Sequence, residues 1–164
     1  MEIKLIIPGK VVPKQSAKFT QIAGFIKAYQ PSRVKDYANF IKLCFMDKYK
    51  DHNPNVFKGK MLEMYVTEFR IVPKSKNKTF KQRALAGEIR PITKPDTDNI
   101  TKQVKDALNM IAYPDDAQIV KDVTEKFYSD IPRIEILIKE ICDGSCKKEE
   151  KESQKEKTDT SDNT

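Results

Sequence analysis

Four aspartates flank one predicted helix in a short stretch of the chain, residues 94–118. Asp96 and Asp98 come just before a segment with helical spacing, and Asp115 and Asp116 follow that segment. Close like charges repel one another, so a group of this kind usually needs a cation to neutralise it. Oxygen ligands with no His or Cys nearby favour Mg²⁺, or Mn²⁺ in its place, over zinc. We therefore expect a divalent-metal site in this stretch.

One basic residue extends this interpretation from metal binding to chemistry. Lys102 follows Asp98 by one helical turn, so its ammonium group would lie beside the expected metal. In phosphoryl chemistry, charge develops on oxygens in the transition state, and both a metal and an ammonium group stabilise it. The structural alternative is that the first aspartates only cap a helix and the later pair only forms a turn. The combination with Lys102 favours the catalytic interpretation.

A helix must position these groups, and the sequence after Asp98 predicts one. Asp98 or Thr97 is the expected N-cap, and Pro114 ends the segment. Apolar residues recur at helical spacing and form a core stripe, which consists of Ile100, Val104, Ala107, Leu108 and Ile111.

The distribution of charge predicts a polyanionic partner. The net charge is +7 and the sequence pI is about 9.2. Residues 1–94 contain 20 Lys and Arg against 7 Asp and Glu, whereas residues 95–146 contain 6 against 11. A basic first half that can hold a phosphate backbone thus precedes an acidic cluster that can hold a cation. The candidate DNA contacts are Lys14, Lys18, Lys74, Lys76, Lys78, Lys81, Arg83 and Lys94. The alternative is that these side chains only lie on solvated surfaces.

Several other classes of protein are disfavoured. The cysteines, Cys44, Cys142 and Cys146, lack zinc-site spacing, and their odd number without a signal peptide predicts a cytoplasmic protein. No apolar run approaches the roughly 20 residues of a membrane span. A calcium-binding EF-hand loop that begins at Asp96 would need Gly and Glu where this chain has Thr101 and Ala107. The single histidine, His52, is expected to be an exposed loop residue.

The remaining pattern predicts a single α/β (α+β) domain over residues 1–142, with a mixed sheet flanked by helices. Expected strands cover residues 2–7, 61–72, 118–128 and 132–141, and residues 25–29 pair as a hairpin around Gly24 with the strand before them. Expected helices cover about 33–49, with Ser32 as N-cap, and 79–86. The last two strands are expected to form an antiparallel hairpin. Residues 143–164 contain no aliphatic or aromatic residue and are expected to form a disordered charged tail.

The acidic stretch resembles the RusA family of Holliday junction resolvases. The pattern is carried by Lys94-Pro95-Asp96-Thr97-Asp98-Asn99, then Lys102, Asp106-Ala107-Leu108, and Asp115-Asp116-Ala117-Gln118-Ile119. The opening segment IIPGKVVPKQSAKF is also similar to the first strand and basic loop of that family.

The resemblance implies a Mg²⁺-dependent homodimeric endonuclease that resolves four-way DNA junctions by paired cuts, in DNA recombination and repair. Its catalytic residues would be Asp96, Asp98, Asp116 and Lys102, with the three aspartates as metal ligands and Asp115 as an additional candidate. A bacterial or prophage origin is expected. The alternatives left open are a non-catalytic nucleic-acid-binding protein and an Asp-x-Asp metal-dependent phosphatase.

Overall fold

The chain is built on a mixed four-stranded sheet. The computed structural model describes residues 1–22 and 24–141, so the expected tail, Cys142 and Cys146 lie outside the described residues. The sheet order is β1 (Glu2–Pro8), β6 (Arg133–Glu140), β4 (Leu62–Ile71) and β5 (Ile119–Ser129). β6 pairs antiparallel with both β1 and β4, whereas β4 and β5 run parallel. The predicted mixed sheet is confirmed.

One face of this sheet carries the hydrophobic core, because alternate residues of each strand point to the same side. β1 and β4 alternate between buried and more exposed positions along almost their whole length. Helices α1 (Ser32–Lys48) and α3 (Thr97–Leu108) pack against each other, α1 also against β1 and α3 also against β5. The largest fully buried side chains include Phe45, Phe57, Ile41, Met64, Ile100, Leu108 and Tyr113.

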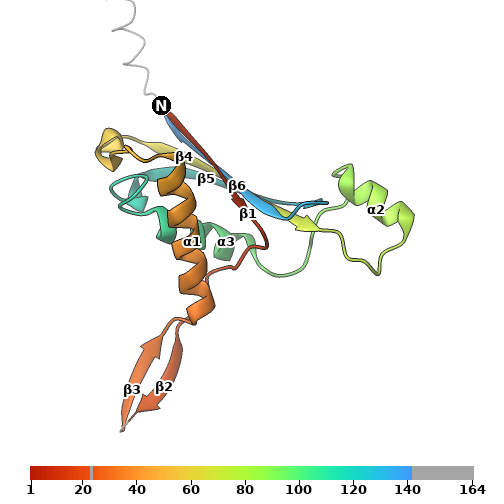
Figure 1. Cartoon of the computed structure of the whole chain (residues 1–164), viewed down its shortest axis with the longest axis horizontal. Helices are drawn as coiled ribbons and strands as arrows, with labels where there is room; N and C mark the ends of the chain where they lie inside the picture. The colour runs from red at the N-terminus through yellow and green to blue at the C-terminus, as the bar shows by residue number, and fades with distance from the viewer. Residues whose placement is uncertain (23, 142–164) are drawn as a thin grey trace, which may run out of the picture.

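Two segments extend away from this core at different ends of the molecule (Figure 1). One is a hairpin arm, β2 (Lys18–Ile22) and β3 (Phe25–Tyr29), which forms a sheet of its own. It confirms the predicted hairpin, and Gly24 at its turn has φ +85°, a conformation that favours glycine. The other is the short helix α2 (Lys78–Leu85), which packs against β5. Two 3₁₀ turns, η1 (Pro54–Phe57) and η2 (Asp116–Gln118), complete the fold.

The expected hairpin between the last two strands is wrong. β5 and β6 do not pair with each other, because β4 lies between them and pairs with both. The reason is tertiary. β4 carries an unbroken buried row, Leu62, Met64 and Val66, each 0% exposed. A strand with such a row is stabilised most in the centre of the sheet, where neighbours on both sides shield it.

The helix boundaries also differ from the expected ones. Asp96, not Thr97 or Asp98, is the N-cap of α3, and the helix ends at Leu108, so Ile111 packs on the core from the following turn. α1 begins at Ser32, so its N-cap is Pro31 and not Ser32 as expected. Such shifts of one or two residues are common, because several local cap geometries compete.

His52 is not the exposed loop residue that its neighbours suggested. It is half-buried, its Nε2 lies 2.8 Å from the carbonyl oxygen of Ala112, and its ring meets Phe45 edge to face. His52 therefore joins the turn after α1 to the turn after α3, which is a structural role. Within residues 1–22 and 24–141, no helix is long and apolar enough to cross a membrane.

Candidate active site

An open cavity of about 480 Å³ lies between α3 and β5. Its lining is polar or charged throughout and consists of Thr97, Asp98, Thr101, Lys102, Lys105, Asp106, Asp116, Asp122 and Thr124. Three of the four residues expected to be catalytic, Asp98, Lys102 and Asp116, therefore line one cavity. The sequence separates Asp98 from Asp116 by a whole helix and a turn, and the fold brings them back to one place.

Helix α3 supplies one wall of the cavity because it is amphipathic. Ile100, Val104 and Leu108 are 0% exposed and hold the helix on the core. The opposite face carries Asp98 and Lys102, one turn apart and both exposed. Asp98 lies in the first turn, where the partial positive charge of the helix N-terminus stabilises a carboxylate.

The other wall comes from η2 and the first half of β5. Asp116 is half-buried at the start of η2. The turn after it is anchored by Gln118, whose Nε2 donates to the carbonyl oxygens of Phe57 (2.5 Å) and Lys60 (3.0 Å). A hydrogen bond between the hydroxyls of Thr101 and Thr124 ties the two walls together at the floor of the cavity.

Two lysines in and beside the cavity are held by carboxylates. Lys105 Nζ lies 2.5 Å from Asp122 Oδ2, and Lys14 Nζ lies 2.5 Å from Asp106 Oδ2. Lys14 reaches the site because its backbone N–H donates to the carbonyl oxygen of Asn99 (2.9 Å). Among the described residues, Lys102 makes no ion pair. It is therefore the lysine of this cavity that can meet an incoming anion without first breaking an ion pair.

Tyr113 lies beneath the acidic wall. Burial, and then the nearby carboxylates of Asp116, Asp106 and Asp122, raise the pKa of the Tyr113 hydroxyl. The hydroxyl, which stays protonated, donates to the carbonyl oxygen of Lys105 (3.3 Å). Tyr113 thus packs beside three carboxylates of the cavity lining.

Asp96 and Asp115 stand outside the cavity lining. Asp96 is exposed at the N-cap of α3, and its side chain makes no capping hydrogen bond. Asp115 caps η2, because its Oδ1 accepts a hydrogen bond from the backbone N–H of Ala117 (2.9 Å). Their expected roles as metal ligands remain predictions, and Asp115 already has a structural role.

The donor set fits Mg²⁺ in kind, because the described residues that line the cavity include carboxylates but no His or Cys. Among the described residues, no group of three or more His, Cys, Asp or Glu side chains is arranged to hold a metal ion, so the expected ring of three aspartates is not formed. Mg²⁺ in phosphoryl-transfer sites commonly takes one or two carboxylates and completes its shell with water and substrate phosphate. Asp98 and Asp116, which line the same cavity, are the two carboxylates of the motif that fit this pattern.

Most of the other expected DNA contacts divide between the two projecting segments. Lys18 lies on the hairpin arm. Lys74 and Lys76 precede α2 and Lys78, Lys81 and Arg83 lie in it, where Arg83 pairs with Glu88 at 2.8 Å. Lys94 is exposed just before Asp96. Phe80, which lies among these lysines, packs edge to face against Tyr128 and beneath Lys76.

The motif does not identify two charged residues of the cavity, Asp122 and Lys105. A signal for Asp122 exists in the alternation of β5, where Asp122, Thr124 and Lys126 share a face. Their partners in register are Met64, Val66 and Glu68, all of which are buried. The polar face of β5 is thus turned toward α3 rather than toward solvent, which single-strand periodicity cannot reveal.

Two comparisons with known proteins cover most of this chain. A family model described as Endodeoxyribonuclease RusA matches residues 8–139. The chain is also 35% identical over 141 residues to a Bacillus subtilis (strain 168) protein named "Uncharacterized protein YqaN". That alignment covers 85% of this chain and 96% of the relative. Every residue of the cavity lies within both the described structure and the matched range.

Proposed function

Because the chain belongs to the RusA family of endodeoxyribonucleases, we propose that it is a Mg²⁺-dependent nuclease that resolves four-way DNA junctions by paired cuts. Other branched DNA is included among its substrates, and recombination and repair are the processes that supply them. The relative from Bacillus is consistent with a bacterial origin.

One observation supports this proposal most strongly. The match to the family covers most of the chain, and the fold brings Asp98, Lys102 and Asp116 from separate parts of the family motif to one open cavity. The cavity is wide and polar rather than enclosed and apolar, which suits a charged polymer better than a small apolar ligand.

The roles of the side chains follow from their positions. Asp98 and Asp116 would hold Mg²⁺ from opposite walls of the cavity. When bound, such an ion would polarise the scissile phosphate and lower the pKa of a water molecule. Lys102 contributes an ammonium group that stabilises charge on the phosphate or on the leaving oxygen. Lys105 and Lys14 are held in ion pairs with Asp122 and Asp106, so Lys102 is the lysine of the lining that is assigned to the phosphate.

The assay that tests the proposed function uses a synthetic four-way junction with and without Mg²⁺. We expect nicks on two opposed strands in Mg²⁺, and no nicks when a chelator replaces the ion, because the carboxylates alone provide no electrophile. Mn²⁺ should restore cutting. Gel mapping of each labelled arm measures both the number and the position of the nicks.

Two controls separate the proposal from its alternatives. A linear duplex of the same sequence should be cut far more slowly than the junction. Hydrolysis of a small phosphate ester without cutting of the junction would instead indicate a phosphatase. Tight binding of the junction without a nick in either metal would indicate a non-catalytic DNA-binding protein.

The segment around α2 is proposed to contact the phosphates of the DNA backbone. Lys74, Lys76 and Lys78 are exposed, and the helix stands apart from the core at one end of the sheet (Figure 1). A row of exposed cations on a projecting element can follow phosphates without reading bases.

Replacement of Lys76, Lys78 and Lys81 together by alanine should weaken binding to every DNA sequence. The slope of log Kd against log salt should fall by about 1 for each phosphate that the variant no longer neutralises. Fluorescence anisotropy over a salt series measures this slope. The matched control removes three lysines outside this segment, namely Lys35 and Lys42 of α1 and Lys50 of the turn after it. An unchanged slope for the first variant would exclude α2 from the interface.

The hairpin arm supports the proposal that the protein is a homodimer. Its apolar side chains lie in solvent, with Phe19 71%, Phe25 78% and Ile26 77% exposed. An isolated two-stranded hairpin is marginally stable in water, and exposed apolar patches commonly mark interaction sites. A second copy of the chain that covers this arm would bury these side chains and bring a second cavity to the same junction, as paired cuts require.

A further inference from the structure

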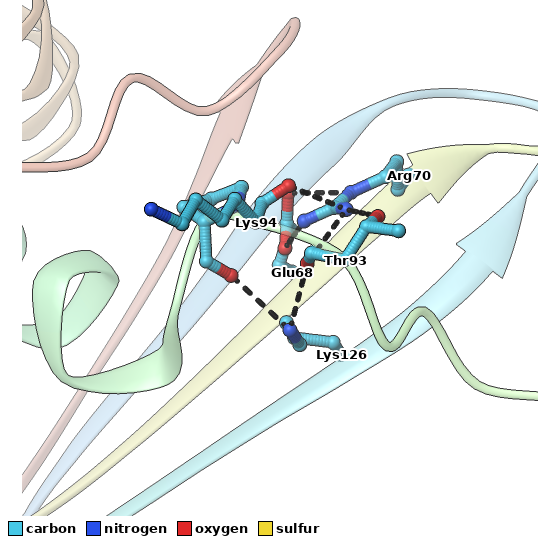
Figure 2. Close-up of polar contacts among 6 residues, drawn as sticks. Glu68, Arg70, Thr93, Lys94 and Lys126 are labelled. Atoms are coloured by element: carbon cyan, nitrogen blue, oxygen red, sulfur yellow. Dashed lines mark hydrogen bonds and ion pairs between the residues drawn. The ribbon is translucent and has the colours of Figure 1, made fainter.

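The segment that leads into Asp96 is held by cationic side chains from two neighbouring strands. Residues 93–95 have no regular structure of their own, and they connect the loop after α2 to the first turn of α3. Their three backbone carbonyls point toward the covered face of the sheet, where Arg70 and Lys126 donate to them (Figure 2). The cavity lies directly beyond this contact, because α3 begins at Thr97.

Arg70, on β4, makes the first half of the contact. Its Nη1 donates to the carbonyl oxygen of Lys94 (3.0 Å), the hydroxyl of Thr93 (3.0 Å) and the carbonyl oxygen of Thr93 (3.3 Å). The same guanidinium is fixed from behind by Glu68. Its Nε donates to Oε1 (3.1 Å) and its Nη2 to Oε2 (2.7 Å) of that carboxylate. Glu68 is 3% exposed, so this two-point pair holds the guanidinium plane in one orientation.

Lys126, on β5, makes the second half. Its Nζ donates to the carbonyl oxygens of Thr93 and Pro95, each at 3.1 Å. Lys126 lies opposite Glu68 in the parallel register of β4 and β5. Figure 2 shows the ammonium reaching the loop from the opposite side to Arg70, while the amino group of Lys94 points away from the contact. All three carbonyls before Asp96 thus accept a charge-assisted hydrogen bond.

This arrangement links the two walls of the cavity through the sheet. Asp116 precedes β5, which carries Lys126, and Asp98 follows the loop that Lys126 binds. The position of the first turn of α3 relative to β5 therefore depends on Lys126 and on Arg70. Neither residue lines the cavity, so each can affect an ion there only through the loop.

We propose that Arg70 and Lys126, with Glu68 behind Arg70, are positioning residues that set the distance between the Asp98 and Asp116 carboxylates. This inference rests on the proposed function, since it concerns the same cavity. Groups that orient metal ligands typically change metal affinity or activity by 10-fold to 100-fold when they are removed.

The test compares Lys126→Met with Lys121→Met on the same strand. Lys121→Met also removes one positive charge, but Lys121 binds Glu63 and Tyr65 on the other face of the sheet. For Lys126→Met we expect the affinity for Mn²⁺, measured by calorimetry without DNA, to fall about 10-fold. The Mg²⁺ concentration for half-maximal junction cutting should rise by a similar factor, with unchanged junction affinity. Lys126→Arg should restore part of both, and Lys121→Met should match the wild type.

A second variant keeps the test decisive if Lys126→Met does not fold. Arg70→Lys keeps the charge but cannot reach Glu68 and the loop carbonyls together, so the same loss of Mn²⁺ affinity is expected. The inference is wrong if both folded variants bind Mn²⁺ as Lys121→Met does. The measurement of Mn²⁺ affinity needs no DNA. A wild-type protein that binds the ion but cuts no junction would therefore contradict the proposed function, and the Mn²⁺ affinities of the variants would still test the positioning role.

Discussion

Asp98→Asn should abolish junction cutting while leaving junction binding intact. The amide has nearly the same size and stays in the first turn of α3, but it removes the negative charge that faces the cavity. The loss of one fixed charge at a site of this kind typically lowers the rate by roughly 100-fold to 1000-fold. Single-turnover cutting at saturating protein, together with a gel-shift titration in Ca²⁺, measures rate and binding separately.

The matched control for this substitution is Asp51→Asn. Asp51 is an exposed aspartate in the turn after α1, outside the cavity, so the same chemical change there should leave the rate within about twofold. Cutting by Asp98→Asn at the wild-type rate in Mg²⁺ would remove Asp98 from the catalytic group and, with it, the assignment of this cavity as the active site.

Lys102→Met should reduce the rate by roughly 100-fold, because it removes an ammonium group that opposes charge on the reacting phosphate. The thioether side chain keeps the length and the helical propensity of lysine, so α3 should remain intact. The loss should appear in the rate at saturating Mg²⁺ and not in the Mg²⁺ concentration that gives half the maximal rate. This pattern distinguishes Lys102 from Lys126, whose removal should change the second quantity.

Two further variants define the role of Lys102. Lys102→Arg keeps the charge and should recover a substantial part of the rate. Lys35→Met, which removes an exposed lysine from α1, should cut as the wild type does. If Lys102→Met raised only the Mg²⁺ requirement, Lys102 would act on the metal ligands and not on the phosphate.

The sequence predicts the parts of this molecule that are encoded locally. Helical spacing from Ile100 to Leu108 identifies α3 and places Asp98 and Lys102 on its exposed face, because a 3.6-residue period leaves little choice. Alternation likewise identifies all four strands of the sheet. The hairpin arm follows from Gly24 between two short strands.

The incorrect prediction of strand pairing and the residues that the sequence did not identify both depend on tertiary contacts. Adjacency in the chain favours the pairing of β5 with β6, but β4, with its buried apolar row, lies between these strands and pairs with both. Asp122 enters the cavity only because the polar face of β5 turns toward α3. Arg70 and Lys126 contact the loop before Asp96 across 23 and 31 residues, respectively. No local pattern encodes such distances.

The position of β6 has a consequence for how the protein can be made. β1 pairs with β6 and with no other strand of the described sheet, and β6 also covers one side of β4. β1, the first strand to leave the ribosome, therefore cannot form its hydrogen bonds within the sheet until β6, the last strand, has been synthesised. During synthesis, β1 and one edge of β4 remain open to other chains, and the sheet closes only after release of residues 133–140. A transcript cut short before that point would encode a protein with no complete core.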